Sequence, residues 1–318
     1  MINDPVLINE WHVVGRSADL VEGQIKPARL LGEDLVLWRL NGQVMAWQEL
    51  CVHRGTRLSL GKVEADCLIC PYHGWTYNNQ GNCVRIPAHP DQAPPAKARV
   101  KVYKSQERYG AIWASLGEPS YDLPDLEEWQ DPSYRTIISG PHPYHAHAPR
   151  AIENFLDMAH LPFVHEGYLG EPAQAEVNDY EAEVGPEGII ARDIRMWQPD
   201  PDGTGVGAIV SYTFRVFRPL LAHFCKEKYA AMLAVTPVDE THSIGWMMAG
   251  IQGREDVPEH ALYDFQRLII NQDVPIVESQ RPELLPLDLQ AELHLRSDRT
   301  AIAYRKWLKD LGVTFGVA

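Results

Sequence analysis

The chain contains the stretch Cys51-Val-His-Arg-Gly and, further along, Cys70-Pro-Tyr-His-Gly-Trp. Each of these two pieces offers one thiolate and one imidazole within a short loop that contains glycine. A 2Fe–2S centre in which two histidines replace two cysteines on one iron needs this set of ligands. The stretch therefore predicts such a cluster, with the ligands Cys51, His53, Cys70 and His73.

A structural zinc site, or unrelated cysteines in the core, would use the same residue types. Zinc fingers place both cysteines before both histidines, with the histidines on a helix. Here cysteine and histidine alternate along the chain, and the flanking segments have the composition of strands. The order of the ligands therefore favours the iron–sulfur cluster.

Composition limits the classes of function. The 318 residues are 45% apolar and 23% charged, which is typical of a globular protein large enough for two domains. A net charge of -14 argues against nucleic acid as a partner, and five cysteines, an odd number, argue against a disulfide framework. There is no apolar run of the roughly 20 residues that cross a bilayer, and no basic region followed by an apolar stretch at the N-terminus. We expect a cytoplasmic protein with no membrane partner.

The N-terminal part has the pattern of an all-β domain. Residues 35–40 and 43–48 have strand-like composition and flank Asn41-Gly42, a strong signal for a two-residue hairpin. The first candidate cluster loop directly follows such a strand, and the second runs directly into one. We therefore expect each loop at the tip of a hairpin, where a rigid and exposed site suits electron transfer.

The segment Gly117-Glu-Pro-Ser-Tyr-Asp-Leu-Pro124 is rich in turn residues and predicts a domain boundary. We expect one domain at 1–118 and a second at 119–318. In the second, strand-like segments alternate with turns, and the helical segments are 150–161, 258–281 and 297–311. This is an α+β fold, in which antiparallel strands around the long helix would leave a pocket.

Residues 154–165, Asn-Phe-Leu-Asp-Met-Ala-His-Leu-Pro-Phe-Val-His, carry the candidate chemistry of the second domain. Asp157 and His160 are three apart and would be neighbours on a helix. His160 and His165 are five apart, about 140° around a helix, so we expect Pro162 to break the helix and let His165 fold back. Two histidines and one carboxylate form a facial triad that leaves positions open on Fe(II) for dioxygen. Ordinary core histidines are the alternative.

The third ligand of this triad is expected from elsewhere in the chain. We assign Asp157 to the outer ring N–H of His160, which orients that ligand, and we place Asn154 beside it in the same supporting role. Asp273 is the best candidate for the carboxylate ligand, because a carboxylate among apolar residues on the inward face of a helix is costly unless it is paired or metal-bound. A surface carboxylate is the alternative for Asp273.

A competing cluster lies in Pro141-His-Pro-Tyr-His-Ala-His147, whose three histidines could bind zinc or nickel. No carboxylate is near in sequence, and the two prolines suggest a loop that enters a strand. We favour a surface or pocket-rim position for these histidines.

With both motifs in place, the chain resembles the oxygenase (alpha) component of the Rieske non-haem iron oxygenases over its full length. The four cluster ligands match that family, as do Asn154, Asp157, His160 and His165, and Asp273 falls where the family has its carboxylate ligand. The segments 30–38 and 85–90 look most similar to toluenesulfonate methyl-monooxygenase and related saxitoxin-pathway hydroxylases.

This resemblance implies an all-β Rieske domain followed by a helix-grip (START-like) catalytic domain. It also implies a head-to-tail homotrimer, in which His73 of one copy bonds Asp157 of the next, so that Asp157 is also an electron bridge. The implied system uses O2 and a separate reductase that passes electrons from NADH through a flavin and its own iron–sulfur cluster. A Rieske electron carrier without oxygenase activity is the alternative class.

The expected reaction is hydroxylation of a methyl or similar C–H group, with the methyl of an aryl sulfonate or carboxylate such as toluenesulfonate as the first choice. O-demethylation of a methoxyaryl acid (the vanillate type) and hydroxylation of a guanidinium alkaloid (the saxitoxin type) are the alternatives. The candidate pocket residues are Phe155, Leu161, Phe163, Arg192 and Arg195, of which the arginines could anchor an anionic group.

Overall fold

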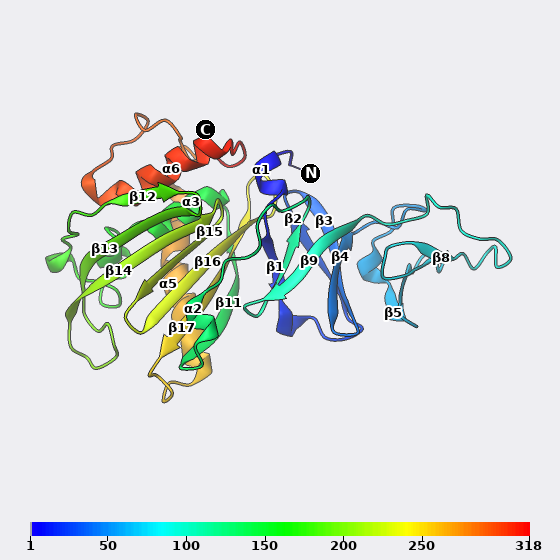
Figure 1. The fold of residues 1–318 in the computed structure, drawn as a ribbon, viewed down its shortest axis with the longest axis horizontal. Coiled ribbons are helices and arrows are strands. Elements are labelled where there is room, and N and C mark those ends of the chain that lie inside the picture. Colours follow the sequence, from blue (N-terminus) through cyan, green and yellow to red (C-terminus); the bar gives the residue numbers. More distant parts are fainter. Residues whose placement is uncertain (1) are drawn as a thin grey trace. The chain divides into compact units, whose positions relative to one another are not determined.

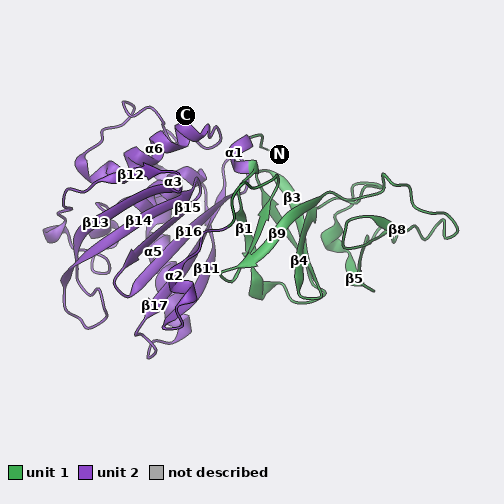
Figure 2. Cartoon of the chain, in the orientation of Figure 1, with its two compact units in different colours: residues 1–3, 8–122 green, residues 4–7, 123–318 purple. Residues whose placement is uncertain are grey.

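The computed structural model describes residues 2–318 and divides the chain into two compact units. Unit 1 contains Ile8–Asp122 with the residues before Asp4, and unit 2 contains Asp4–Leu7 and Leu123–Ala318 (Figure 2). Each unit is described by itself below.

Unit 1 consists of two antiparallel sheets (Figure 1). The first has six strands in the order β1-β10-β9-β4-β3-β2, and the second has four strands in the order β5-β6-β7-β8. The strands are β1 His12–Arg16, β2 Ile25–Leu30, β3 Glu33–Leu40, β4 Gln43–Gln48, β5 Lys62–Glu64, β6 Cys67–Ile69, β7 Thr76–Tyr77, β8 Cys83–Arg85, β9 Val102–Arg108 and β10 Ala111–Ser115. Its short helical turns are η1 Ser17–Asp19 and η2 Leu58–Leu60, whereas most of α1 Pro5–Ile8 belongs to unit 2.

The predicted hairpin between β3 and β4 is confirmed. Asn41 and Gly42 connect the strands with φ angles of 52° and 75°, the left-handed pair that a two-residue turn requires. Because the turn fixes the register, Trp38 and Trp47 lie on the same buried face, with their rings edge to face and their centroids 4.8 Å apart. This packing forms the core beneath the two cluster loops.

Unit 2 is built on one antiparallel sheet of seven strands in the order β11-β17-β16-β15-β14-β13-β12. Its strands are β11 Tyr134–Tyr144, β12 Ala182–Gly185, β13 Gly188–Gln198, β14 Ala208–Arg218, β15 Leu221–Lys226, β16 Tyr229–Pro237 and β17 Ser243–Gln252. Its helices are α2 Glu127–Gln130, α3 Ala148–Leu156, α4 Leu161–Val164, η3 Pro172–Gln174, α5 Glu259–Ser279, η4 Arg296–Asp298 and α6 Arg299–Leu311.

The long helix α5 lies along one face of this sheet (Figure 1). Its buried residues recur at helical spacing: Leu262, Gln266, Ile270, Asp273 and Val277. The predicted α+β class, an all-β N-terminal part followed by an antiparallel sheet against a long helix, is confirmed. In the described part of the chain, no helix is both long enough and apolar enough to cross a membrane.

The helix expected at 150–161 ends at Leu156, so the expectation that Pro162 breaks it is wrong. The backbone N–H of Asp157 bonds the Asn154 carbonyl, and the chain then leaves the helix. Pro162 instead lies in the first turn of α4, where backbone N–H groups have no partner within the helix, so the N–H that proline lacks costs no hydrogen bond. Residues 175–184 have strand-like composition, but only β12 from Ala182 to Gly185 forms a strand there.

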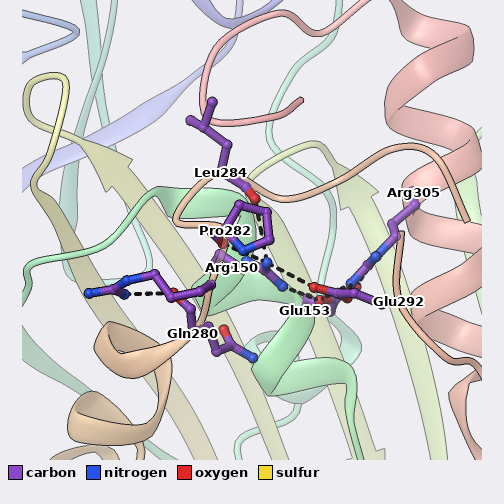
Figure 3. A network of polar contacts seen from close by, with 8 residues as sticks. Arg150, Glu153, Gln280, Pro282, Leu284, Glu292 and Arg305 are labelled. Carbon is purple, nitrogen blue, oxygen red and sulfur yellow. Dashed lines mark hydrogen bonds and ion pairs between the residues drawn. The ribbon is translucent and has the colours of Figure 1, made fainter. Parts of the chain in front are cut away.

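A buried ionic network ties α3 to α6 and to the segment between α5 and α6 (Figure 3). Arg305 donates to Glu153 through Nε and Nη2, at 2.5 and 2.8 Å, and also to Glu292. Arg150 donates to Glu292 at 3.0 Å and to the Pro282 carbonyl at 2.8 Å. The network therefore fixes the helix that leads into residues 157–165.

Candidate metal centres

The two cluster loops in unit 1 adopt the same backbone turn. The N–H of Gly55 bonds the Cys51 carbonyl at 2.9 Å, and the N–H of Gly74 bonds the Cys70 carbonyl at 3.1 Å. Both glycines have positive φ, 72° and 70°, a conformation that side chains with a Cβ rarely adopt. The repeated turn explains why each loop carries a glycine after its ligand pair.

The predicted cluster ligands lie together at the tips of these loops. Cys51 and Cys70 are 2% exposed, and the imidazoles of His53 and His73 lie 4.5 Å apart between ring centroids. Burial raises the pKa of the Cys70 thiol, so the thiolate form needs a nearby cation. The Nδ1 atom of His53 is buried without a hydrogen-bond partner. Buried thiols and an unpartnered imidazole nitrogen fit a metal cluster better than a cluster-free core.

In unit 2, His160, His165 and Asp273 bring three ligand atoms to one point. The two Nε2 atoms are 3.3 Å apart, and Asp273 Oδ1 lies 3.4 Å from Nε2 of His160 and 3.1 Å from Nε2 of His165. Ligands about 2.1 Å from a metal and 90–110° apart are separated by about 3.0–3.4 Å. The triangle therefore matches one face of a coordinated metal ion.

Helices α4 and α5 produce this triangle. His160 directly precedes α4 and His165 directly follows it, so a single helical turn sets their spacing. Asp273 comes from the buried face of α5, and its Oδ1 atom has no partner that meets hydrogen-bond geometry. A buried carboxylate oxygen aimed at two imidazoles without a good hydrogen bond is the feature that best fits a bound cation.

The electrostatics of the triad also favour a positive charge at its centre. Burial alone would lower the pKa of His160, but Asp157 and Asp273 outweigh it and raise this pKa to about 9. Burial alone would raise the pKa of Asp273, but the two histidines lower it. The site thus holds a proton strongly between acid and imidazoles, and a metal cation can take the place of that proton.

Two side chains face the outer nitrogens of the triad imidazoles, of which the one at His165 is within hydrogen-bond distance. The carboxylate of Asp157 lies 3.5 Å from Nδ1 of His160, and its other oxygen accepts from the N–H of Ala159 at 2.7 Å. Gln272 Oε1 lies 2.8 Å from Nδ1 of His165. If Nδ1–H donates to each oxygen, both Nε2 atoms are free to bind metal. Sequence reasoning missed Gln272, although its position next to Asp273 was a usable signal.

A cavity of about 720 Å³ opens onto the triad. Three of the predicted site residues, Asn154, Phe155 and Leu161, line it together with Asp157 and the metal-binding side chains. Further aromatic side chains form its walls: Tyr212, Phe214, Phe224, Tyr229 and Phe265. Such a cavity suits a flat, mostly apolar molecule.

Contrary to expectation, Phe163, Arg192 and Arg195 are not among the residues that line the cavity. Phe163 is 61% exposed on α4. Arg195 alternates with the buried Ile194 on β13, so it points to the opposite face of the strand. Arg192 is exposed and pairs with a surface carboxylate.

The three histidines of the competing cluster do not converge. His142 bonds Ser139 in the core, His145 faces His242 at 2.9 Å between Nε2 atoms, and His147 packs against Phe315. None of the three lines the cavity. This outcome follows from the end of β11 at Tyr144, after which the chain no longer alternates as a strand.

A 2Fe–2S-type ligand set in one unit and a two-histidine, one-carboxylate triad in the other define an oxygenase of the Rieske class. Residues 10–104 match the Rieske [2Fe-2S] domain, and residues 144–313 match the vanillate O-demethylase oxygenase C-terminal domain. The chain belongs to the Rieske non-haem iron oxygenases. It is therefore an oxidoreductase, and the family supports both a 2Fe–2S cluster and a mononuclear iron as its cofactors.

Named relatives share much of the chain. It is 31% identical to methylxanthine N1-demethylase NdmA of Pseudomonas putida, over 98% of this chain and 91% of the relative. It is 33% identical to the toluene-4-sulfonate monooxygenase iron–sulfur subunit TsaM1 of Comamonas testosteroni, over 53% of this chain and 49% of the relative. The solved structure of NdmA with caffeine superposes with a TM-score of 0.82 at 29% identity, covering 96% of this chain and 90% of that one.

Proposed function

We propose that this protein is the terminal oxygenase of a multicomponent system and oxidises a methyl group on a flat aromatic or heteroaromatic substrate. An electron-transfer domain (1–118) serves a catalytic domain (119–318). The observation that carries the proposal is that His160, His165 and Asp273 line an aromatic-walled cavity of about 720 Å³. A carrier of electrons alone would need no such cavity.

The chain's own residues divide the work. The cluster is held by Cys51, His53, Cys70 and His73, and Fe(II) by His160, His165 and Asp273. When bound, these centres supply electron transfer and activation of O2. The aromatic walls exclude water and hold the substrate ring, so that its methyl group faces the triad.

We further propose that Asp157 passes electrons between subunits of a head-to-tail homotrimer. The His73 imidazole is exposed, and the Asp157 side chain is 37% exposed, so both are accessible to a neighbouring copy. In this arrangement Asp157 bonds His160 of its own chain and His73 of the next chain. A partner reductase, with NADH and a flavin, supplies the electrons.

The reaction consumes one O2, two electrons and two protons, and it yields one water and a hydroxymethyl group. A hydroxymethyl on nitrogen or oxygen breaks down to formaldehyde and the demethylated product, whereas one on an aryl carbon is retained. N- or O-demethylation is the first reaction to test, because a relative that matches 98% of this chain is named an N-demethylase. Methyl hydroxylation of toluenesulfonate is the second, because of the similarity to TsaM1.

Turnover with a reductase and NADH tests the proposal. The substrates are caffeine, vanillate, 4-methoxybenzoate, toluenesulfonate and a guanidinium alkaloid, with formaldehyde and hydroxymethyl products measured. We expect one product to form in proportion to NADH, with oxygen from ¹⁸O2 in the product or in the formaldehyde. Oxidation of NADH without any oxygenated product across the panel would contradict the proposal.

A further inference from the structure

We propose that Lys226 forms an anion-binding subsite in the cavity and selects aromatic substrates that carry a carboxylate, sulfonate or similar anionic oxygen. This inference rests on the proposed function, because it assumes that the substrate occupies the cavity of the triad. It replaces Arg192 and Arg195, which the sequence suggested as anchors and which lie outside that cavity.

Lys226 is held among the aromatic walls. It is the last residue of β15 and lines the same cavity as the triad. Its Nζ lies 5.4 Å from the ring centroid of Tyr212 and 5.7 Å from that of Tyr229. Both contacts are cation–π contacts, which position the ammonium group without neutralising it.

The ammonium group has only one hydrogen-bond partner among the described residues. Nζ donates to Oε1 of Gln198 at 2.5 Å, and no described carboxylate lies within ion-pair distance of it. An ammonium has three N–H donors, so two remain for a ligand. Because this partly buried ammonium has no ion-pair partner in the described part of the chain, an anionic group that enters the cavity is attracted to it.

The neighbouring polar groups are already engaged with one another. Gln198 Nε2 donates to the Tyr212 hydroxyl at 2.6 Å, and Gln266 Nε2 donates to the Tyr229 hydroxyl at 2.8 Å. These bonds hold both rings in place. Each hydroxyl accepts in its bond and keeps its own O–H as a donor, but Lys226 is the group among them that offers a positive charge with unused donors. The same positive charge repels a guanidinium alkaloid, so the structure favours the anionic members of the substrate panel.

Titration of Lys226 gives a second readout. Burial lowers its pKa to about 8, with Glu227 opposing the shift. Tyr212 on β14 and Tyr229 on β16 face the ammonium, and burial raises the pKa of both hydroxyls, to about 12 for Tyr229. Lys226 is thus the member of this group that loses its charge just above neutral pH, and an anion bound beside it raises its pKa further.

The test compares two probes of the same shape, 4-methoxybenzoate and the neutral 4-methoxybenzamide. Their dissociation constants are measured by anaerobic calorimetry on the iron-loaded full chain at pH 7, for the wild type, Lys226→Met, Lys226→Arg and Lys306→Met. Lys306 is an exposed lysine on α6 outside the cavity, so Lys306→Met removes the same charge elsewhere.

We expect the wild type and Lys306→Met to bind the benzoate about tenfold more tightly than the benzamide, as one charge-assisted hydrogen bond provides. Lys226→Met should lose this preference and Lys226→Arg should keep it. Raising the pH to 9.5 should weaken benzoate binding to the wild type and not to Lys226→Arg. A preference that survives in Lys226→Met, or a wild type that binds no benzoate, overturns the inference. Turnover is scored separately, so a cavity that binds anions without oxidising any methyl group contradicts only the proposed function.

Discussion

Neutralising Glu153 tests whether the ionic network of Figure 3 sets the stability of the catalytic unit. Glu153 is 9% exposed, and Arg150 and Arg305 are each 2% exposed. Glu153 accepts hydrogen bonds from Nε and Nη2 of Arg305 at 2.5 and 2.8 Å, and its Oε2 lies 3.5 Å from Nη1 of Arg150. Glu153→Gln leaves the partly exposed carboxylate of Glu292 as the negatively charged group that the two buried guanidinium groups still share.

Removing one partner of a buried ion pair costs about 3–5 kcal/mol, because the remaining charge stays buried without compensation. Glutamine retains one acceptor oxygen, so we expect the lower end, about 3 kcal/mol. This is a large share of a typical unfolding free energy of about 5–15 kcal/mol. With a urea m-value of about 3 kcal/mol/M or less, the unfolding midpoint should fall by about 1 M or more.

Urea unfolding followed by circular dichroism measures this loss. The control is Glu283→Gln, because Glu283 forms an exposed pair with Arg281 at 3.1 Å and its loss should cost about 0–1 kcal/mol. The double variant Glu153→Gln, Arg305→Met should recover part of the stability, since it removes one uncompensated charge. A loss of less than about 1 kcal/mol in Glu153→Gln would refute the reasoning.

Three further predictions concern the catalytic unit. Gln272→Leu should weaken Fe(II) binding about 10–100-fold in metal titrations, because the outer nitrogen of His165 then has no acceptor. Gln272→Glu keeps an acceptor oxygen and should bind Fe(II) as the wild type does. Equal Fe(II) affinities of Gln272→Leu and the wild type would exclude this role. Asp157→Asn should keep both metals and lose nearly all turnover, and substantial activity would exclude the electron bridge. Burial alone would raise the pKa of Glu292, but the hydrogen bonds from Arg305 and Arg150 lower it further than burial raises it. A carboxylate whose pKa is lowered by folding stabilises the fold at pH values above its unfolded pKa of about 4.3, and this stabilisation is lost as the pH falls below that value. The unfolding free energy should therefore be lower at pH 3.5 than at pH 6. An unfolding free energy that does not fall would contradict this ion pair.

The features predicted correctly from the sequence depend on residues close together in the chain. The Asn41-Gly42 hairpin follows from the turn alone, and the inward face of α5 follows from its helical spacing. The class of oxygenase followed from two motifs with unusual ligand content. These signals need no knowledge of distant neighbours.

The features that the sequence did not predict depend on tertiary contacts. The end of α3 at Leu156 has no proline or glycine to mark it. Arg195 and Lys226 both lie on strands of unit 2, and the face of the sheet to which each side chain points decides that Lys226 lines the cavity and Arg195 does not. Lys226 also precedes the charged Glu227 and Lys228, a sequence typical of a solvated turn. The substrate cavity was therefore predicted only in outline.

The most direct test of the central claim is iron analysis of the purified chain, with the variant Asp273→Ala beside the wild type. The wild type should hold about three irons per chain, two in the cluster and one at the triad. Asp273→Ala should hold about two, with the visible spectrum of the 2Fe–2S cluster unchanged. Two irons in the wild type, or three in the variant, would contradict the assignment of His160, His165 and Asp273 as the site of oxygenase chemistry.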